Sequence, residues 1–320
     1  MGTAELSCAS LEKLALDGTF SVVAVVTQPD RPKGRELKPQ PSPVKTLAQR
    51  LGLTVLQPPR VRDEQFLAEL RALLPDLIVV AAYGQILPQS ILDLPRRGCL
   101  NVHTSLLPRY RGAAPIQWAI ANGDAETGVT LMKMDAGLDT GNIVAQRRTV
   151  IQPADDSATL HDRLARLGAE LLVQTIPDYV AGKIQPLPQP IEGVSLAPKI
   201  KKEDGRIDWH LPAKTIWNRL RAFTPWPGAF TSWSSSFGLI RSQDTLKREL
   251  QSHLLKIWKA EVVEKSGEAG EVLSADKSGI VAAGGKDALR ILELQLEGGR
   301  RMSAAEFLAG HPLKAGGKFL

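Results

Sequence analysis

Short apolar runs alternate with amphipathic stretches through the first half of the 320-residue chain. The apolar runs are rich in β-branched residues, which predicts the buried strands of a parallel sheet. They cover residues 22–27, 77–82, 99–103 and 129–132. The stretches between them have apolar residues at helical spacing and cover residues 64–74, 115–121 and 158–181, with a further helix beginning at Ser42-Pro43. This alternation predicts an α/β domain built on a doubly wound parallel sheet.

The second half of the chain has a different pattern. A polar stretch at residues 198–205 interrupts the periodicity, and we interpret it as a linker. A helix is predicted at residues 213–223, and several short β runs follow it, some of them separated by glycine-containing turns. These runs are residues 229–233, 254–260, 270–275, 279–282 and 289–295. Many short strands predict a small barrel or sandwich, so we place a domain boundary near residue 205.

Composition narrows the class of protein. The chain is 43% hydrophobic and 23% charged, with a mean hydropathy of −0.10, as is typical of globular proteins in water. No apolar run approaches the roughly 20 residues that span a bilayer, and Met1 is not followed by a secretory signal, so we expect a cytoplasmic protein without membrane contact. Cys8 and Cys99 belong to no CxxC or Cys/His cluster, which argues against a disulfide framework and against a bound metal.

The balance of charge is basic. The net charge is +6 and the isoelectric point is near 9.3. Residues 205–320 contain 17 Lys or Arg against 12 Asp or Glu, so most of the positive excess lies in the second half. A basic β domain beside a catalytic domain is suited to binding RNA. An ordinary basic protein with scattered charge has the same numbers, so charge alone leaves both interpretations open.

One apolar run ends in polar side chains that can carry chemistry. In Asn101-Val102-His103, strand alternation places Asn101 and His103 on the same side. The carboxyl ends of strands line the ligand crevice of an open parallel sheet. A second apolar run, residues 129–134, leads into a loop where Gly137 and Gly141 flank Asp139 and allow a sharp bend. Asn, His and Asp together can transfer an acyl group to an amine. Taken singly, each could instead be a residue bonded to nearby backbone or a turn-forming Asp.

These residues resemble a known signature. Asn101-Val102-His103, then Ser105-Leu106-Leu107-Pro108, then Asp139 are similar to the motif of the formyltetrahydrofolate-dependent formyltransferases. Longer strings narrow the resemblance to the branch of this family that formylates methionyl initiator tRNA. They are TQPDRP at 27–32, PSPVK at 41–45, YGQILP at 83–88, RGAAPIQ at 111–117, GDAETGVT at 123–130, IDW at 207–209 and FTPWPG at 223–228. The resemblance therefore extends over nearly the whole chain.

The resemblance implies a fold and a set of roles. It implies a Rossmann-like formyltransferase domain over residues 1–190, a basic linker over 191–205 and an OB-like, tRNA-binding barrel over 206–320. It assigns Asn101, His103 and Asp139 to catalysis, with 10-formyltetrahydrofolate as the co-substrate and no metal. The residues that it assigns to the folate are Ser105, Leu106, Leu107, Pro108, Tyr83, Gly84, Ile86 and Leu87. A monomeric enzyme is expected.

The resemblance also gives a role to two groups of basic residues. A loop with Lys33, Arg35 and Lys38 matches the family loop that approaches the acceptor stem of the tRNA, with Arg35 near the first base pair. A Gly-containing basic loop can become ordered on an RNA groove and gain phosphate contacts. The linker lysines match a basic segment that faces the RNA, and they are Lys199, Lys201 and Lys202. Without the resemblance, the loop would be interpreted as a solvated surface loop.

The amino terminus departs from the family pattern. The family has an apolar strand before a Gly-Thr-Pro turn, whereas this sequence starts at Met1-Gly2-Thr3 and has Ala4 in place of the proline. A first strand is therefore apparently missing from the centre of the predicted sheet, which should expose two strand edges and open the core. We expect either a start upstream of Met1 or a truncated chain.

The function expected from the sequence is formyl transfer from 10-formyltetrahydrofolate to the amino group of methionyl initiator tRNA. Two alternatives remain. The first is the same chemistry on a small amine, such as a glycinamide ribonucleotide or an amino sugar nucleotide. The second is a folate- or RNA-binding protein without turnover, which the missing strand would make plausible.

Overall fold

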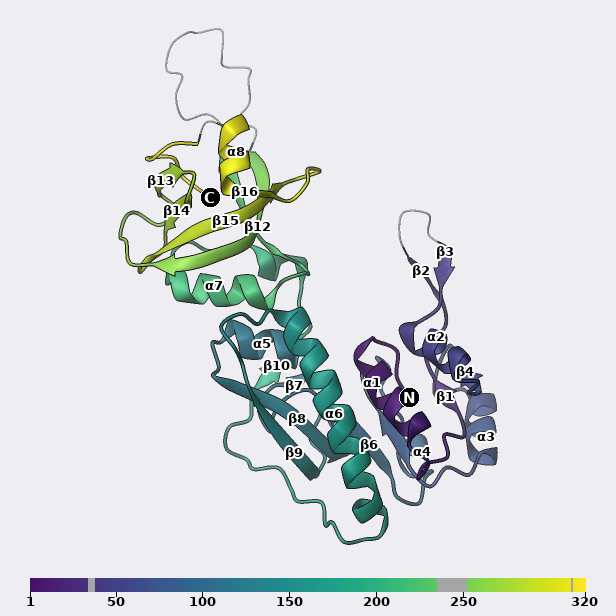
Figure 1. Ribbon diagram of the computed structural model, residues 1–320. Helices are drawn as coiled ribbons and strands as arrows, with labels where there is room; N and C mark the ends of the chain where they lie inside the picture. Colours follow the sequence, from purple (N-terminus) through teal and green to yellow (C-terminus); the bar gives the residue numbers. More distant parts are fainter. Residues whose placement is uncertain (34–37, 235–251, 312) are drawn as a thin grey trace. The chain divides into compact units, whose positions relative to one another are not determined.

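The computed structural model describes residues 1–33, 38–234, 252–311 and 313–320 (Figure 1). The chain divides into two compact units. The first unit consists of Met1–Ile116, Ala125–Gln152 and Thr159–Pro198. The second consists of Gln117–Asp124, Pro153–Ala158 and Lys199–Leu320. No helix among the described residues is both long and apolar enough to cross a membrane.

The first unit is built on a mixed sheet. Its strands lie in the order β5 (Ile78–Val80), β6 (Cys99–His103), β8 (Glu126–Lys133) and β9 (Ile143–Val150). Only β5 and β6 are parallel, because β8 runs antiparallel to both β6 and β9. The prediction of a wholly parallel sheet is therefore wrong for residues 129–132. A strand buried along both faces has the same apolar pattern in either direction, and only its partners decide which applies.

A second parallel pair is linked to this sheet through the first two residues of the chain. Strand β1 (Val25–Val26) pairs with β4 (Val55–Leu56), so the strand predicted at residues 22–27 is only two residues long. The amide of Gly2 donates to the carbonyl of Val26 at 2.9 Å, and Gly2 forms a parallel bridge with Ala81 of the β5 segment. A Cβ atom on Gly2 would lie 2.6 Å from Ser7, which explains the glycine at this close approach.

The core beside this bridge contains a cavity. A cavity of about 550 Å³ is lined by apolar side chains from the β1 and β5 segments and from helix α6. Val22, Val25, Leu77 and Val79 belong to this lining. The two parallel strands are thus linked through Met1 and Gly2 instead of along a continuous ladder.

Most helices between residues 1 and 180 follow local sequence signals, but the helices at residues 6–16 and 89–92 were not predicted. The predicted Ser42 cap is confirmed, since its hydroxyl accepts from the amide of Lys45 at 3.0 Å, and α2 (Pro43–Arg50) begins with proline. The remaining helices are α1 (Leu6–Leu16), α3 (Glu64–Ala72), α4 (Gln89–Leu92), α5 (Pro115–Ala121) and α6 (Ser157–Val180). Helix α1 was not predicted, because its apolar positions form no clear stripe.

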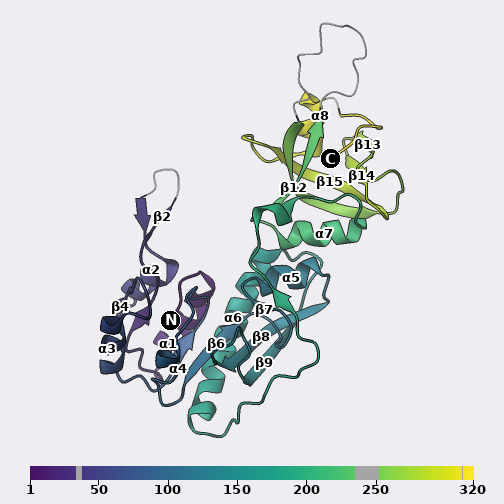
Figure 2. The ribbon, with the colours of Figure 1, turned by 180° about the vertical axis from the view of Figure 1, so that it is seen from behind.

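Helix α6 lies against the sheet, as Figures 1 and 2 show. A Cβ atom on Gly168 would lie 2.8 Å from Val102 of β6 and 3.4 Å from Val129 of β8, so the glycine allows close packing. Leu160, Leu164, Leu171 and Leu172 are buried, which confirms the core prediction for these four leucines, whereas Leu167 is half-buried. Two short pairs complete the unit: β2 (Arg31–Lys33) with β3 (Lys38–Gln40), and β7 (Arg111–Gly112) with β10 (Leu196–Ala197).

The second unit is an antiparallel sheet with helices packed against it. A 3-10 helix, η1 (Lys202–Gly205), and helix α7 (Ala213–Ala222) precede the strands. The strands lie in the order β11 (Ala229–Ser234), β12 (Ser252–Val263), β15 (Ala288–Leu296), β14 (Gly279–Ala283) and β13 (Val272–Asp276), and β16 (Met302–Ser303) pairs with β15. All five predicted β runs are confirmed, whereas β16 and helix α8 (Ala304–Gly310) were not predicted.

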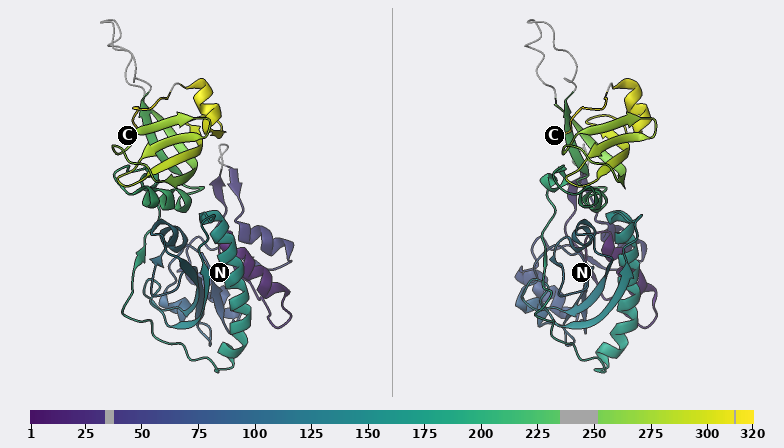
Figure 3. Two further views of the ribbon diagram at one scale, coloured as in Figure 1. Left: turned by 60° about the vertical axis from the view of Figure 1, so that its left-hand side comes forward. Right: turned by 90° about the vertical axis from the view of Figure 1, so that its left-hand side faces the viewer.

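The strands of the second unit curve around one apolar core (Figure 3). Phe307 and Phe319 lie at its centre, and Trp209 stacks on Phe319 with ring centroids 5.5 Å apart. Among the described residues, continuous ladders run from β11 to β13 without closing. Single bridges from Phe319 to Trp233 and from Lys318 to Glu271 lie between these two ends.

Candidate active site

The carboxyl end of β6 presents two polar side chains. Asn101 is half-buried, and the side chain of His103 is 6% exposed. Val80 of β5 is the parallel partner of Asn101, and Thr130 of β8 is the antiparallel partner of His103. Both side chains are therefore anchored on a central strand of the sheet, where their backbone has little freedom.

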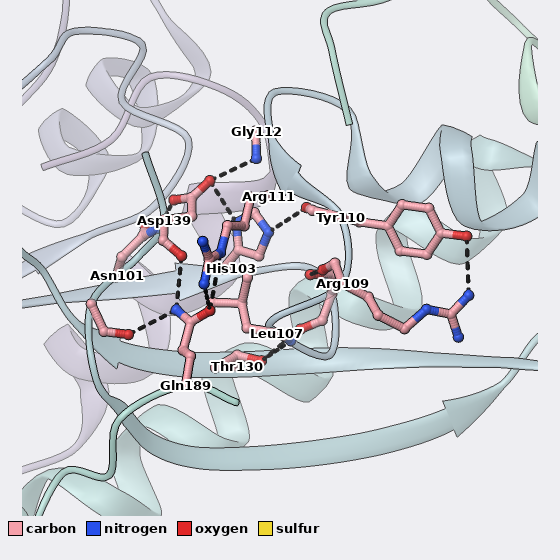
Figure 4. A network of polar contacts seen from close by, with 12 residues as sticks. Asn101, His103, Leu107, Arg109, Tyr110, Arg111, Gly112, Thr130, Asp139 and Gln189 are labelled. Carbon is pink, nitrogen blue, oxygen red and sulfur yellow. Dashed lines mark hydrogen bonds and ion pairs between the residues drawn. The ribbon is translucent and has the colours of Figure 1, made fainter. Parts of the chain in front are cut away.

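The loop between β8 and β9 brings a carboxylate to these side chains (Figure 4). Asp139 has φ = 51°, in the left-handed region. Its Oδ2 atom accepts from the amide of Gly112 at 2.8 Å and lies 3.7 Å from His103 Nδ1. Its Oδ1 atom accepts from Asn101 Nδ2 at 3.5 Å. The structure thus brings together Asn101, His103 and Asp139, which were grouped from the sequence although Asp139 lies 38 positions after Asn101.

The hydrogen bonds around His103 define where its protons lie. Its Nε2 atom is 2.9 Å from the carbonyl oxygen of Tyr110. A carbonyl only accepts, so Nε2 must carry a hydrogen. The opposite atom, Nδ1, faces the carboxylate of Asp139, and that contact is favourable when Nδ1 also carries a proton. The pair is therefore arranged to hold or pass one proton between an imidazole and a carboxylate.

The loop after β6 is held by hydrogen bonds from the side chains of Thr130 and Gln146. The hydroxyl of Thr130 accepts from the amide of Leu107 at 3.0 Å and donates to the carbonyl of Ser105 at 2.7 Å. Gln146 Nε2 donates to the carbonyl of Leu107 and to Thr130 Oγ1, both at 2.9 Å. Ser105 and Leu107 are buried, whereas Leu106 and Pro108 are half-buried.

Sequence analysis missed Thr130 and Gln146. The signal for Thr130 was a single hydroxyl within a run of apolar residues, where a buried polar group needs partners. Gln146 had no such signal, because it lies on a strand with alternating exposed positions.

The second predicted folate segment follows β5. Since β5 and β6 are parallel, this segment leaves the sheet at the same edge as His103. Tyr83 and Leu87 are buried in an apolar cluster, Gly84 has φ = 82°, and Ile86 is 78% exposed. The buried hydroxyl of Tyr83 has no hydrogen-bond partner among the described residues, and burial raises its pKa to about 12. The four residues thus differ widely in exposure.

The predicted RNA contacts belong to both units. Lys38 is exposed on β3, and Lys33 lies opposite it in the β2–β3 pair. Arg35 lies outside the described residues. In the second unit, the linker lysines are all exposed: Lys199, Lys201 and Lys202. Among the described residues, no group of three or more His, Cys, Asp or Glu side chains is placed to hold a metal ion.

The fold and the site together define a class of protein. A mixed α/β sheet carries an amide donor, an imidazole and a carboxylate at one strand end, as an enzyme of acyl transfer requires. Family models agree with this class: the formyl transferase model matches residues 2–176 and the formyl transferase C-terminal domain model matches residues 199–312. The chain belongs to the formyl transferase family.

Individual relatives support the same family. The chain is 49% identical to the methionyl-tRNA formyltransferase of Trichlorobacter lovleyi, over 99% of this chain and 94% of that protein. It is 50% identical to the methionyl-tRNA formyltransferase of Myxococcus xanthus, over 99% of this chain and 95% of that protein. Among solved structures, an N-formyltransferase from Helicobacter canadensis shares the fold, with a TM-score of 0.61 and 19% identity over 91% of this chain and 97% of that one.

Proposed function

We propose that this chain transfers the formyl group of 10-formyltetrahydrofolate to the α-amino group of methionyl initiator tRNA. The observation that carries the proposal is the meeting of Asn101, His103 and Asp139 at one strand end of a formyl transferase fold. The full-length relatives at about half identity support the choice of acceptor.

The proposed chemistry begins with a neutral amine. The reference pKa of an α-amino group is near 7.7, so a useful fraction is unprotonated at neutral pH. Attack on the formyl carbon forms a tetrahedral intermediate with a developing oxyanion. Asn101 has two amide hydrogens and uses one of them toward Asp139, so it can donate the other to this oxyanion. His103 is proposed to stabilise the same oxyanion beside Asn101.

Asp139 is proposed to promote loss of the amine proton. Its Oδ2 atom already faces His103 Nδ1, so the proton can pass to the carboxylate directly, through the imidazole or through a water. As the intermediate collapses, the carbon–nitrogen bond to tetrahydrofolate breaks and that nitrogen takes up a proton. The formyl group remains on the methionyl amine.

The folate is proposed to lie along the two segments that leave β5 and β6 at the same edge of the sheet. The residues present fit an aromatic carrier with polar groups. Leu106 and Pro108 offer half-buried apolar contacts, and the Tyr83 hydroxyl is a buried polar atom that lacks a partner among the described residues. Tyr83, Gly84, Ile86 and Leu87 would then shape the pocket, with Ser105 and Leu107 supporting the loop.

The tRNA contact is proposed from two groups of basic residues. Lys33, Arg35 and Lys38 would approach the acceptor stem, and Lys199, Lys201 and Lys202 would follow the RNA backbone.

The proposed domains are residues 1–190 for catalysis, 191–205 as a basic linker and 206–320 as an OB-like tRNA-binding domain. The single bridges of Lys318 and Phe319 support a barrel, since they lie between the two end strands of the sheet. We further propose a cytoplasmic monomer.

The test is formyl transfer by the 320-residue chain to methionyl initiator tRNA, with 10-formyltetrahydrofolate as donor. Transfer to the tRNA that is lost in His103→Ala is the expected result. The same assay with free amino sugar nucleotides and glycinamide ribonucleotide tests the alternative acceptors, and turnover on these without tRNA dependence would overturn the proposal. Binding of tRNA without any transfer, in a folded sample, would favour a protein without turnover.

A further inference from the structure

A segment that follows α6 crosses the site and contacts both of its loops. We refer to residues 185–197 as the strap. At its centre, Gln189 Nε2 donates to the carbonyl oxygens of Asp139 and Gly141, both at 2.8 Å. Gln189 Oε1 accepts from Arg111 Nε at 3.1 Å and from Arg111 Nη2 at 2.7 Å. Figure 4 shows Gln189 between Arg111 and the Asp139 loop.

The orientation of this amide is determined by its partners. Its nitrogen lies between two carbonyl oxygens, which only accept, and its oxygen lies against two guanidinium N–H groups, which only donate. A flipped amide would lose all four hydrogen bonds. Arg111 therefore orients Gln189, and Gln189 in turn holds the backbone of the Asp139 loop.

The loop needs such a restraint. Asp139 occupies the left-handed region, where a non-glycine residue is held at a cost unless its surroundings fix it. Gly137 and Gly141 on either side have wide conformational freedom. The contacts of the Asp139 carboxylate with Asn101 and His103, at 3.5 Å and 3.7 Å, depend on this backbone conformation.

The strap also holds the other loop. Ser195 Oγ accepts from the amide of Tyr110 at 2.9 Å, and the carbonyl of Ser195 accepts from the amide of Arg111 at 2.9 Å. The carbonyl of Tyr110 is the partner of His103 Nε2. The strap thus fixes the backbone on both sides of the His103–Asp139 pair. This explains why it carries polar side chains, Gln189 and Ser195, at these positions.

We propose that Gln189 is a positioning residue for formyl transfer, acting through Asp139 and held in place by Arg111. The inference rests on the proposed function, because it assigns Gln189 to the step in which Asp139 promotes proton removal. Gln189 itself does not touch the reacting atoms. Its two N–H groups keep the Asp139 carboxylate where it meets His103.

The test compares two substitutions at Gln189 with a control on the same segment. Gln189→Ala removes all four hydrogen bonds. Gln189→Glu keeps the size and the contact with Arg111 but places oxygen against the two loop carbonyls. Gln185→Ala is the control, since Gln185 is exposed and donates to the carbonyl of Gly182. Steady-state formylation kinetics with varied tRNA and folate, and thermal unfolding, are measured for each variant.

We expect both Gln189 variants to lose up to about 100-fold in kcat, because a small displacement of a reacting group has effects of this size. KM for both substrates and the unfolding midpoint should stay close to those of the parent. If Gln189 only tethered the segment, its contact with Arg111 would preserve that tether in Gln189→Glu. Full activity in Gln189→Glu would therefore overturn the proposal. A loss in Gln185→Ala equal to that in Gln189→Ala would also overturn it.

A double substitution separates this proposal from the proposed function. If Gln189 acts through Asp139, adding Gln189→Ala to Asp139→Asn should cause little further loss of kcat. Independent, multiplicative losses would contradict action through Asp139. Normal activity in Asp139→Asn alone would refute the role of Asp139 itself, whereas a loss in Asp139→Asn with full kcat in Gln189→Ala would refute only the positioning role.

Discussion

The loops at the site of the first unit and the core of the second unit are stabilised by different kinds of interaction. In the first unit, the loops around the site are tied by side-chain hydrogen bonds from Thr130, Gln146 and Gln189. In the second unit, buried residues form one apolar cluster around Phe307 and Phe319. Each hydrogen bond fixes the direction and distance between two groups but adds little net stability to the fold. Burial of apolar side chains stabilises the fold without fixing the position of a reacting atom. Substitutions in the two units should therefore separate rate from stability.

The largest expected effect is on rate. Asp139→Asn keeps the size of the side chain and suits the left-handed backbone, which Asn tolerates. The amide cannot take up a proton, so kcat should fall by roughly 10²- to 10⁴-fold, the usual size of a general-base contribution. Single-turnover formylation measures the chemical step. Thermal unfolding should be nearly unchanged, and a near-normal rate would remove Asp139 from the mechanism.

The next effect is on stability. Phe307→Ala empties a fully buried position beside Trp233, whose ring centroid is 5.7 Å away. The free energy of unfolding should fall by about 3–5 kcal/mol. All six tryptophans lie in the second unit, so their fluorescence during urea denaturation reports its unfolding.

A matched core substitution in the first unit sharpens this result. Leu100→Ala also empties a fully buried position, but on β6. If the units unfold separately, Leu100→Ala should leave the tryptophan transition in place and shift only the loss of activity. Equal shifts of the tryptophan transition in both variants would show that the units unfold together.

The smallest effect is the pH dependence of the second unit. Glu306 accepts from Arg300 and from the amide of Ser303 at the start of α8, and these contacts lower its pKa to about 2 from an ordinary 4.5. Its contribution to stability is therefore present above about pH 4.5 and lost as pH falls toward about 2. Glu306→Gln should lower the denaturation midpoint slightly at neutral pH, and the difference should shrink in acid.

The control for this prediction is Glu264→Gln, at an exposed bend of the same unit. Its midpoint should follow that of the parent at each pH. A difference between parent and Glu306→Gln that is constant with pH would show that the charge of Glu306 does not stabilise α8.

Elements with a local signal could be predicted from the sequence. Ser42-Pro43 starts a helix because the serine caps its amides and proline already has a helical φ. The first and last residues of the strand at 99–103 were predicted correctly, because this strand combines β-branched and apolar residues with a polar end. The β runs of the second half were found by their short apolar pattern, with glycine-containing turns between some of them. Helix α1 and the antiparallel direction of β8 had no such local signal.

The residues of the site also divide into those with a sequence signal and those without one. Asn101, His103 and Asp139 were grouped from the sequence alone, because strand alternation pairs Asn101 with His103 and the resemblance to a family motif adds Asp139. Thr130, Gln146, Arg111 and Gln189 were not, since their roles depend on partners as much as 78 positions away.

The sequence by itself determined the family to which the chain belongs, most of its strands and helices, and the residues that we propose for the chemistry. Only the tertiary structure decided the direction of β8, the bridge through Gly2 and the conformation of the Asp139 loop. The physical reason is that residue type and spacing set local backbone preference and burial. Strand direction and the position of a carboxylate instead depend on hydrogen bonds with groups that only the folded chain brings near.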